Sequence, residues 1–529
     1  MPSSDPSSSR RPLLLAASFI CSCFNMLVSG SLDVFALYAP SFTTRLGYSQ
    51  TETSAIAIIG NIGLYGVGPV SGHMADKLGP RPTSFIAGCL LALGYGLLSA
   101  GYANGLDSVH HNQPPTPFLF MALYLFLAGM GNSASYMAAF TSLAKNFTHA
   151  RGLALSIPTS FFGLSAAALT LIAHSFFVIK VRSHLHILED KQELDTANFL
   201  LFLGLLGGLV NAIAFVSMRI LPAPNPNTAS NVLDDHTIEP SILQGAAAMV
   251  RDENEETPLL REGSITPTIA NASSVDSQYS TAPTRHPHHH PRSISGKAFF
   301  LDRDAQLFFL VMVCLTGTGL MIINSITAMV DAVAASENAD LPATFIGRLG
   351  DKSPISAIHA VHVGLISCSS YVSRILAGFG SDVAIRRYGT HRINVVPIAA
   401  ACMALAQVVG MFASLRWLYL CSLLTGLGYG GFFGVAGIIV AEFWGEGTCG
   451  QNWGWLSWGS ALGGLLFNLL FGLVMDAARP VVDGEPQACK GHRCFRWALV
   501  ASFLACVFSC GISIIMCIRQ KRGGALRMT

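Results

Sequence analysis

Charged residues are scarce in this sequence. Asp, Glu, Lys and Arg together make up 12% of its 529 residues, whereas a soluble domain usually carries about 25%. A large soluble helical protein would need charged faces on most of its helices, so this scarcity excludes that class. The formal net charge of +2 is also too small to indicate a nucleic-acid partner.

Motifs for enzymatic or nucleotide-driven chemistry are missing from the sequence as well. It contains no GxxxxGK[ST] loop, so it has no recognisable nucleotide motor. It also lacks HExxH, GxSxG and paired CxxC motifs, which leaves no indication of an enzyme, a cofactor or a metal site. His359 and His362 could share one helix face, but no third metal ligand is evident beside them.

Long apolar runs are what the sequence does contain. A helix crosses a bilayer with roughly 20 apolar residues, and in lipid every backbone amide needs a partner inside the protein. The predicted fold class is therefore an all-α integral membrane protein with twelve transmembrane helices in two pseudo-symmetric six-helix bundles. The predicted spans are about 13–38, 54–75, 83–101, 118–142, 152–174, 198–220, 305–330, 355–380, 393–413, 416–440, 453–475 and 496–518.

A polar stretch divides these spans into six and six. Residues 221–303 contain PAPNPNTAS and DENEETPLL and cannot bury enough apolar surface to fold alone. Bases near the ends of the spans favour a cytosolic N-terminus, and the first span is expected to be retained. The predicted order is a cytosolic tail (1–12), an N-terminal bundle (13–220), a disordered cytosolic linker (221–303), a C-terminal bundle (304–518) and a cytosolic tail (519–529).

A short polar motif occurs once in each half, between the second and third spans. The first copy lies in SGHMADKLGPRP (71–82), and internal repeats of this kind are typical of secondary transporters whose halves move about a central site. The motif comprises Gly72, Asp76, Lys77, Gly79 and Arg81 in the first half, and Gly378, Asp382, Arg387, Gly389 and Arg392 in the second.

This repeated motif predicts a cytosolic gate. Glycine at a helix end lets two backbones approach closely, and Asp76 or Asp382 can then face the positive N-terminal end of a helix in the other half. The bases fix the turn on the cytosolic side; alternatively, they only anchor the topology. Glu442, at the end of the tenth span, could join the gate by pairing with Arg392 or could be solvated.

The segment GHMADKLGPR closely resembles the signature between helices two and three of the major facilitator superfamily, although the second copy has extra residues between Asp382 and Gly389. FALYAPSFTTRLGYSQTE (35–52) and the stretch 428–472, which begins GYGGFFGVAG, resemble the nodulin-like branch. Outside the linker, the chain is most similar to the fungal monocarboxylate-permease homologues. This resemblance implies a transporter of the vacuolar membrane, with the plasma membrane as the alternative.

Arg374 lies inside the eighth span, where a charged side chain is costly and usually faces a cavity or a partner. In the monocarboxylate transporters that the chain resembles, an arginine four residues before the matching glycine contacts the carboxylate, and Arg374 and Gly378 keep that spacing. Ser370 replaces the acid that the family carries four residues earlier. Alternatively, Arg374 extends toward the cytosol and ties its helix to Asp382.

Asp33 is an acid inside the first span. It could carry a coupling proton, pair with Arg374 across a cavity, or lie fully wet at the luminal mouth. Asn61, Asn324 and Asn468 could line the same cavity or form hydrogen bonds between helices.

Two features of the loops concern trafficking and redox state. Glu255, Leu259 and Leu260 form an acidic dileucine pattern in the linker, which a coat adaptor would bind for delivery to the vacuole. Cys489 and Cys494 share the loop CKGHRC and could form a disulfide if that loop faces an oxidising space.

Together these observations predict a secondary active transporter that moves a small solute by alternating access. A monocarboxylate or other organic anion, carried with protons, is the expected cargo. The alternatives are a nutrient receptor or scaffold that has lost transport, and an amino-acid or cation transporter on the same fold. The expected partners are the solute, protons, the lipid bilayer and a coat adaptor.

The dileucine pattern generates the first prediction. Replacing both leucines (Leu259→Ala with Leu260→Ala) is expected to remove a fluorescently tagged protein from the vacuole rim, because the adaptor loses its leucine pair. The matched control is Val232→Ala with Leu233→Ala elsewhere in the linker. A double variant of Leu259 and Leu260 that stays on the vacuole rim would make the motif incidental.

Overall fold

The computed structural model describes residues 6–111, 113–147, 151–181, 191–221, 294–337, 354–412, 414–479, 481–482, 485–486 and 489–525. Within these residues, twelve helical segments are long and apolar enough to cross a membrane. The predicted fold class, an all-α integral membrane protein with twelve spans, is confirmed.

The N-terminal bundle contains the first six spans, of which the first two are interrupted. The first span consists of α1 (Pro6–Ser29), η1 (Ser31–Val34) and α2 (Phe35–Arg45), and the second of α3 (Gln50–Asn61), η2 (Ile62–Gly66) and α4 (Gly68–Lys77). The other four are α5 (Pro80–His110), α6 (Phe118–Asn146), α7 (Arg151–Phe176) and α8 (Thr196–Ser217), with the antiparallel strands β1 (Val178–Val181) and β2 (Lys191–Leu194) between α7 and α8.

The C-terminal bundle contains the last six spans. These are α12 (Arg303–Glu337), α13 (Pro354–Tyr388), α14 (Val395–Phe412), α15 (Leu418–Trp444), α16 (Cys449–Ala477) and α17 (Arg496–Ala525). Short elements connect them: α11 (Lys297–Leu301), η3 (Arg392–Asn394), η4 (Glu446–Thr448), η5 (His492–Cys494) and the antiparallel pair β3 (Val481–Val482) and β4 (Glu485–Pro486).

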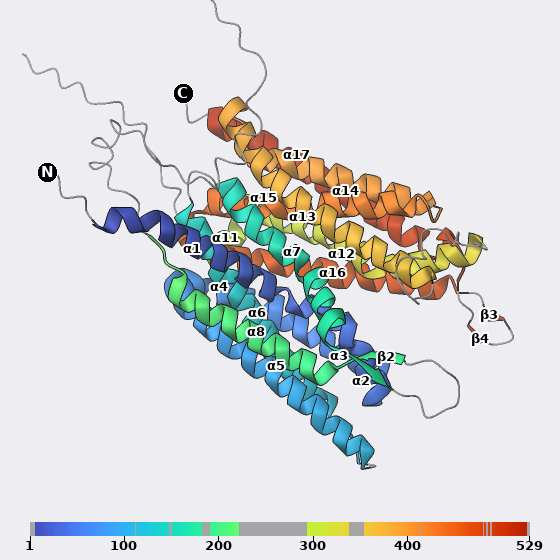
Figure 1. Cartoon of the computed structure of the whole chain (residues 1–529). Coiled ribbons are helices and arrows are strands. Elements are labelled where there is room, and N and C mark those ends of the chain that lie inside the picture. The colour runs from blue at the N-terminus through green and yellow to red at the C-terminus, as the bar shows by residue number, and fades with distance from the viewer. Residues whose placement is uncertain are drawn as a thin grey trace, which may run out of the picture. The chain divides into compact units, whose positions relative to one another are not determined.

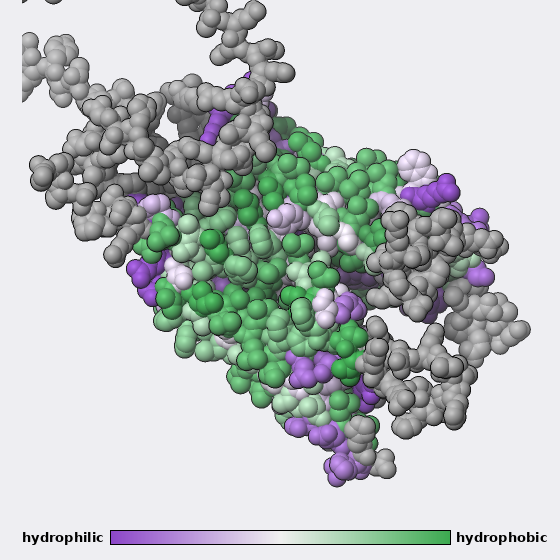
Figure 2. Space-filling view, viewed as in Figure 1, coloured by the Kyte–Doolittle hydropathy of each residue, from purple (hydrophilic) through white to green (hydrophobic). Residues whose placement is uncertain are grey.

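Six spans in each bundle bring the beginning of α1 and the end of α17 to the same side of the helices (Figure 1). We call this side the termini face, and the side that carries β1 to β4 the opposite face. Hydrophobic side chains cover the middle of the visible surface, whereas hydrophilic ones gather toward its ends (Figure 2). Exposed apolar residues such as Leu205 and Ile398 therefore face lipid, as the scarcity of charge in the spans predicts.

The interruptions of the first two spans have local causes. A side chain at Gly30 would collide with Ser165 of α7, so this glycine lets α1 approach α7. The second span makes a π-helical turn in η2 and then continues after Pro69, which cannot donate a backbone hydrogen bond. Such breaks in transporter helices expose polar groups to a central cavity, and here η1 carries Asp33 while η2 carries Tyr65.

The linker ends earlier than the sequence predicted. The carbonyl of Ile294 accepts hydrogen bonds from Thr448 (3.2 Å) and Asn452 (2.8 Å). Phe299 of α11 is 3% exposed, and its ring lies 5.2 Å from that of Trp444. Residues 294–303 are therefore part of the C-terminal bundle and not of the linker, because the apolar residues of KAFFL (297–301) bury their side chains on it.

The predicted C-terminal tail and the rest of the predicted linker are the two other boundaries concerned. The last helix, α17, continues to Ala525, so that most of the predicted tail 519–529 extends this helix. The remainder of the predicted linker, including Glu255, Leu259 and Leu260, lies outside the described residues.

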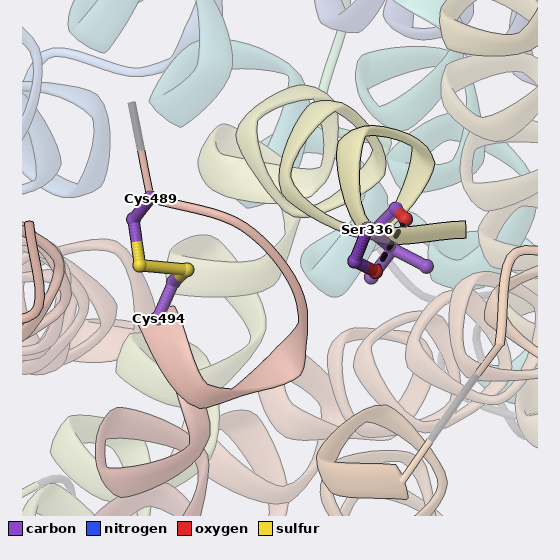
Figure 3. Close-up of a disulfide and its surroundings, with 4 residues drawn as sticks. Ser336, Cys489 and Cys494 are labelled. Atoms are coloured by element: carbon purple, nitrogen blue, oxygen red, sulfur yellow. Dashed lines mark hydrogen bonds between the residues drawn. A yellow bond between two sulfur atoms is a disulfide. The ribbon is translucent and has the colours of Figure 1, made fainter. Parts of the chain in front are cut away.

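Cys489 and Cys494 form a disulfide before α17, on the opposite face (Figure 3). Between them, the backbone N–H of Gly491 donates to the carbonyl of Ala332 (2.6 Å), close to the end of α12 that carries Ser336. The disulfide thus closes a short loop that is attached to the end of α12.

Candidate functional site

Asp76, in the last turn of α4, joins the two bundles at the termini face. Its carboxylate accepts hydrogen bonds from the backbone N–H groups of Gly450 (3.3 Å) and Gln451 (2.8 Å), in the first turn of α16. Lys145 Nζ lies 3.4 Å from the same carboxylate. A negative charge is stabilised at a helix N-terminus, where unsatisfied N–H groups point outward, so this contact attaches the end of α4 to the other bundle.

Asp382 of α13 makes the corresponding contact, in which the C-terminal bundle supplies the acid and the N-terminal bundle supplies the helix N-terminus. Its carboxylate accepts hydrogen bonds from the N–H groups of Gly152 (3.1 Å) and Leu153 (3.0 Å), in the first turn of α7. Arg392 Nη2 lies 2.6 Å from this carboxylate. It corresponds to Lys145, which lies 3.4 Å from the carboxylate of Asp76. The repeat in the sequence therefore corresponds to two equivalent contacts, which we call the two latches: Asp76 on α16 and Asp382 on α7.

Glycines make both latches sterically feasible. A Cβ at Gly72 would overlap the backbone of Gly450, and a Cβ at Gly378 would overlap the backbone of Gly152 and the side chain of Ser156. A Cβ at Gly380, two residues further along α13, would meet nothing within 4 Å. The glycines of the repeated motif therefore let the helices of the two bundles touch backbone to backbone at both latches.

Further ion pairs surround the second latch. Arg392 bridges Asp382 and Glu442, whose Oε1 lies 2.6 Å from Arg392 Nε, so the two side chains that the sequence suggested could pair are in contact. Arg151 of α7 forms an ion pair with Glu446 of the other bundle. Glu446 was not predicted from the sequence, although its position directly after the tenth span, in FWGEG, was a signal for it.

The remaining motif residues serve other purposes. Arg81 donates to the carbonyl of Phe215 (2.7 Å) inside its own bundle, and Arg387 stacks on its neighbour Tyr388. Lys77 is exposed at the end of α4. The structure therefore places none of these three bases across the two bundles, and their positions match the alternative of topology anchors.

The two glycines that follow the aspartates have a conformational role. Gly79 and Gly389 adopt positive φ angles of 89° and 61°, which residues with a side chain rarely adopt. Each glycine therefore forms the tight turn that starts the chain toward the next span.

Arg374 lies between the bundles, deeper than the latches. Its side chain is 4% exposed, Nη1 donates to the carbonyl of Thr159 (2.6 Å), and the guanidinium lies 5.2 Å from the ring centroid of Phe433. Gly163 leaves room for it, because a Cβ there would come within 3.1 Å of the guanidinium carbon. Its Nε has no hydrogen-bond partner, and no carboxylate pairs with it, in the described part of the chain.

Asp33 and three tyrosines complete what we call the central site. Asp33 is exposed and interacts electrostatically with Arg374 from the other bundle, but the two do not form an ion pair. Tyr65 of η2, Tyr136 of α6 and Tyr429 of α15 lie within electrostatic range of the same guanidinium. These tyrosines were not predicted from the sequence, because nothing in their local pattern distinguishes them from packing aromatics; only the glycine-flanked LYG at Tyr65 was a signal.

The candidate asparagines lie in two different places. Asn324 Nδ2 donates to Asn468 Oδ1 (3.3 Å), which joins α12 to α16 inside the C-terminal bundle. Asn61 is exposed near the end of α3, next to η2. Asn324 and Asn468 therefore follow the alternative of interhelical hydrogen bonding.

The two histidines of α13 contact different helices. His359 Nε2 lies 2.8 Å from Asp331, and His362 Nδ1 lies 2.8 Å from Ser422 Oγ while its ring stacks on Tyr419. No group of three potential metal-ligating side chains occurs among the described residues.

The contacts between the bundles extend from the termini face to the level of the central site. Beyond the latches, Ser160 donates to the carbonyl of Tyr371 (3.3 Å), and Trp458 donates to that of Gly66 (3.1 Å). Toward the opposite face the helices of the two bundles diverge (Figure 1), and Asp33 is exposed there. The hydrogen bonds between the bundles therefore lie on the termini-face side and at the level of the central site.

This architecture defines a multi-pass membrane protein with the fold of major facilitator superfamily transporters. The chain is similar to the proton:xylose symporter XylE, with a TM-score of 0.57 and 11% identity over 94% of this chain and 95% of XylE. A bacterial homologue of the iron transporter ferroportin, in an outward-facing state, gives a TM-score of 0.55 and 12% identity over 95% of this chain and 98% of that one.

The sequence relatives are more specific. Residues 16–239 match the family model named Nodulin-like. The chain is homologous to fungal proteins named "Probable transporter mch1": it is 25% identical to that of Emericella nidulans over 96% of this chain and 85% of the relative. It is 26% identical to that of Neurospora crassa over 96% of this chain and 90% of the relative. The resemblance to the nodulin-like branch and to fungal permease homologues is thus confirmed.

The latch geometry generates the second prediction. Native Cys449 is fully buried directly before Gly450 at the first latch, so its labelling by a maleimide measures opening of the termini face. Gly378→Leu disrupts the second latch, and the bundles should then separate at both latches and raise Cys449 labelling several-fold. Mass spectrometry of labelled peptides measures this. The control, Gly380→Leu on the same helix, should label like the wild type; equal labelling of all three proteins would refute coupled latches.

Proposed function

We propose that this protein is a secondary transporter that carries a small organic anion by alternating access. The observation that supports the anion most strongly is Arg374: a guanidinium buried between the bundles without a carboxylate partner in the described part of the chain. An uncompensated buried charge is costly. A carboxylate of the solute would satisfy it through two parallel charge-assisted hydrogen bonds.

The two latches supply the conformational equilibrium that alternating access requires. A charge at a helix N-terminus contributes about 0.3–1 kcal/mol, and up to about 2 kcal/mol where partly buried. Inverting a two-state equilibrium from 1:99 to 99:1 takes about 5.5 kcal/mol. Two such latches with their ion pairs are of that order, so binding of the solute between the bundles can change which face is open.

Asp33 is proposed to carry the coupled proton. It lies in the bundle opposite Arg374, interacts with it electrostatically, and is exposed. Because Ser370 occupies the position where the family carries its acid on the eighth span, a carboxyl on the first span is the available substitute. If Asp33 instead holds an amine or a metal cation, the cargo is an amino acid or a cation, which is the main alternative.

The proposed orientation places the termini face in the cytosol. A disulfide persists in an oxidising space, and the one between Cys489 and Cys494 lies on the opposite face. The proposed location is the vacuolar membrane. It is supported by the dileucine pattern that ends at Leu260 and by the similarity to fungal permease homologues.

A receptor without transport is the second candidate function, because the linker could serve signalling. Counterflow in proteoliposomes separates the two: a transporter exchanges labelled solute across the vesicle membrane, and a receptor does not. The names of the fungal relatives and the charged residues between the bundles favour transport.

Arg374 generates the third prediction. Arg374→Gln should reduce counterflow of labelled monocarboxylates tenfold or more, because hydrogen bonds to charged groups contribute about 1.5–3 kcal/mol each. Arg374→Lys should recover only part of the activity, since an ammonium cannot form two parallel bonds. Arg387→Gln, at an exposed base that stacks on Tyr388, serves as the control. Full counterflow by Arg374→Gln would exclude direct carboxylate recognition.

Asp33 generates the fourth prediction. Asp33→Asn cannot bind and release a proton, so uptake driven by a pH gradient should be lost while counterflow without a gradient persists. The measurement compares both assays across a series of external pH values. An unchanged pH dependence would count against proton coupling through Asp33. Loss of counterflow as well, for a solute that carries an amine, would favour the amino-acid alternative.

A further inference from the structure

An apolar cavity of about 290 Å³ lies beside the C-terminal bundle near the termini face, away from the central site. Its size is close to the lower end of the range for small-molecule sites, roughly 300–1,000 Å³. The residues that line it come from α11 and from the first two turns of α12 and α16: Phe299, Phe300, Ala305, Gln306, Phe309 and Trp455, among others.

This cavity opens toward lipid. Phe300 and Leu310, which line it, are 47% and 41% exposed on the outside of the bundle, where the surrounding surface is apolar. The first turns of α12 and α16 lie at the termini face, so the cavity is at the depth where acyl chains meet headgroups. Its natural occupant is therefore a chain of the bilayer itself.

Positive charge lies next to the cavity. Lys297 and Arg303 flank the lining residues in the chain; both are exposed, and neither has a partner in the described part of the structure. The neighbouring acids are already engaged, since Asp304 pairs with Arg519 (2.8 Å) and Asp302 accepts from the N–H of Ala305 (2.9 Å). The two bases are thus available to a negatively charged headgroup.

A hydrogen-bond donor without a partner in the described residues belongs to one of the residues that line the cavity. The indole Nε1 of Trp455 is buried without a hydrogen-bond partner in the described residues, although its ring packs on Phe300 at 4.6 Å. Buried donors nearly always have an acceptor. A glycerol ester carbonyl, which stands between the headgroup and the acyl chain, supplies one at the required depth.

We propose that this cavity binds one anionic phospholipid of the leaflet at the termini face. An acyl chain fills the aromatic lining, an ester carbonyl accepts from Trp455, and Lys297 and Arg303 hold the phosphate. The site is separate from solute recognition, and its lipid would contact α16, the helix whose first turn forms the first latch.

Native mass spectrometry of the full chain, with phosphatidylinositol or phosphatidylcholine of matched acyl chains, tests this proposal. The wild type should retain one phosphatidylinositol at lipid concentrations where phosphatidylcholine is lost. Lys297→Gln with Arg303→Gln should reduce phosphatidylinositol occupancy several-fold, and Leu310→Trp, which fills the cavity from its exposed side, should also reduce it. Arg416→Gln, an exposed base on the opposite face, is the control and should bind like the wild type.

Three outcomes would overturn the proposal. Equal retention of the two lipids by the wild type would remove the headgroup preference. Unchanged binding by the variant lacking Lys297 and Arg303 would remove the phosphate contact. Unchanged binding by Leu310→Trp would show that the lipid sits on the surface and not in the cavity. All variants are checked for a monodisperse, helical protein, and none of these readouts depends on transport.

Discussion

The contact on which the rest of the structure depends is a carboxylate placed at the N-terminus of a helix in the other bundle. Asp76 on α16 and Asp382 on α7 each accept hydrogen bonds from N–H groups that would otherwise lie unpaired between the two bundles. In a membrane the hydrophobic effect does not drive helices together, so polar contacts and close backbone packing decide how the bundles associate. Gly72 and Gly378 permit that packing.

These latches also bear on the central site, because it lies between the same two bundles. They hold the bundles together at the termini face, and Arg374 and Asp33 lie deeper between the same two bundles. Arg374 is buried there and pairs with no acid among the described residues, and Asp33 lies within electrostatic range of it on the other bundle. A site that is electrostatically incomplete in one conformation, and enclosed by contacts that can break, has the properties required for coupling binding to a conformational change.

Much of this could be predicted from local sequence. Twelve apolar runs predict twelve helices because lipid leaves no other way to satisfy the backbone. The duplicated Gly-x-x-x-Asp motif predicts where the bundles meet, because glycine and an acid at a helix end have few other uses in a membrane. Arg374 was identifiable because a charge inside a span is costly. By contrast, the roles expected for Lys77, Arg81 and Arg387 were not distinguishable from topology anchoring until their contacts were known.

The sequence alone determined the span count, the repeat and the residues whose chemistry is unusual in lipid, since each of these follows from one local stretch of chain. Only the tertiary structure decided which N–H groups the aspartates bind, that Tyr65, Tyr136 and Tyr429 lie near one guanidinium, and that residues 294–303 pack on the C-terminal bundle. The physical reason is distance along the chain. Gly450 meets Asp76 through packing between bundles, and no periodicity within a single helix records that contact.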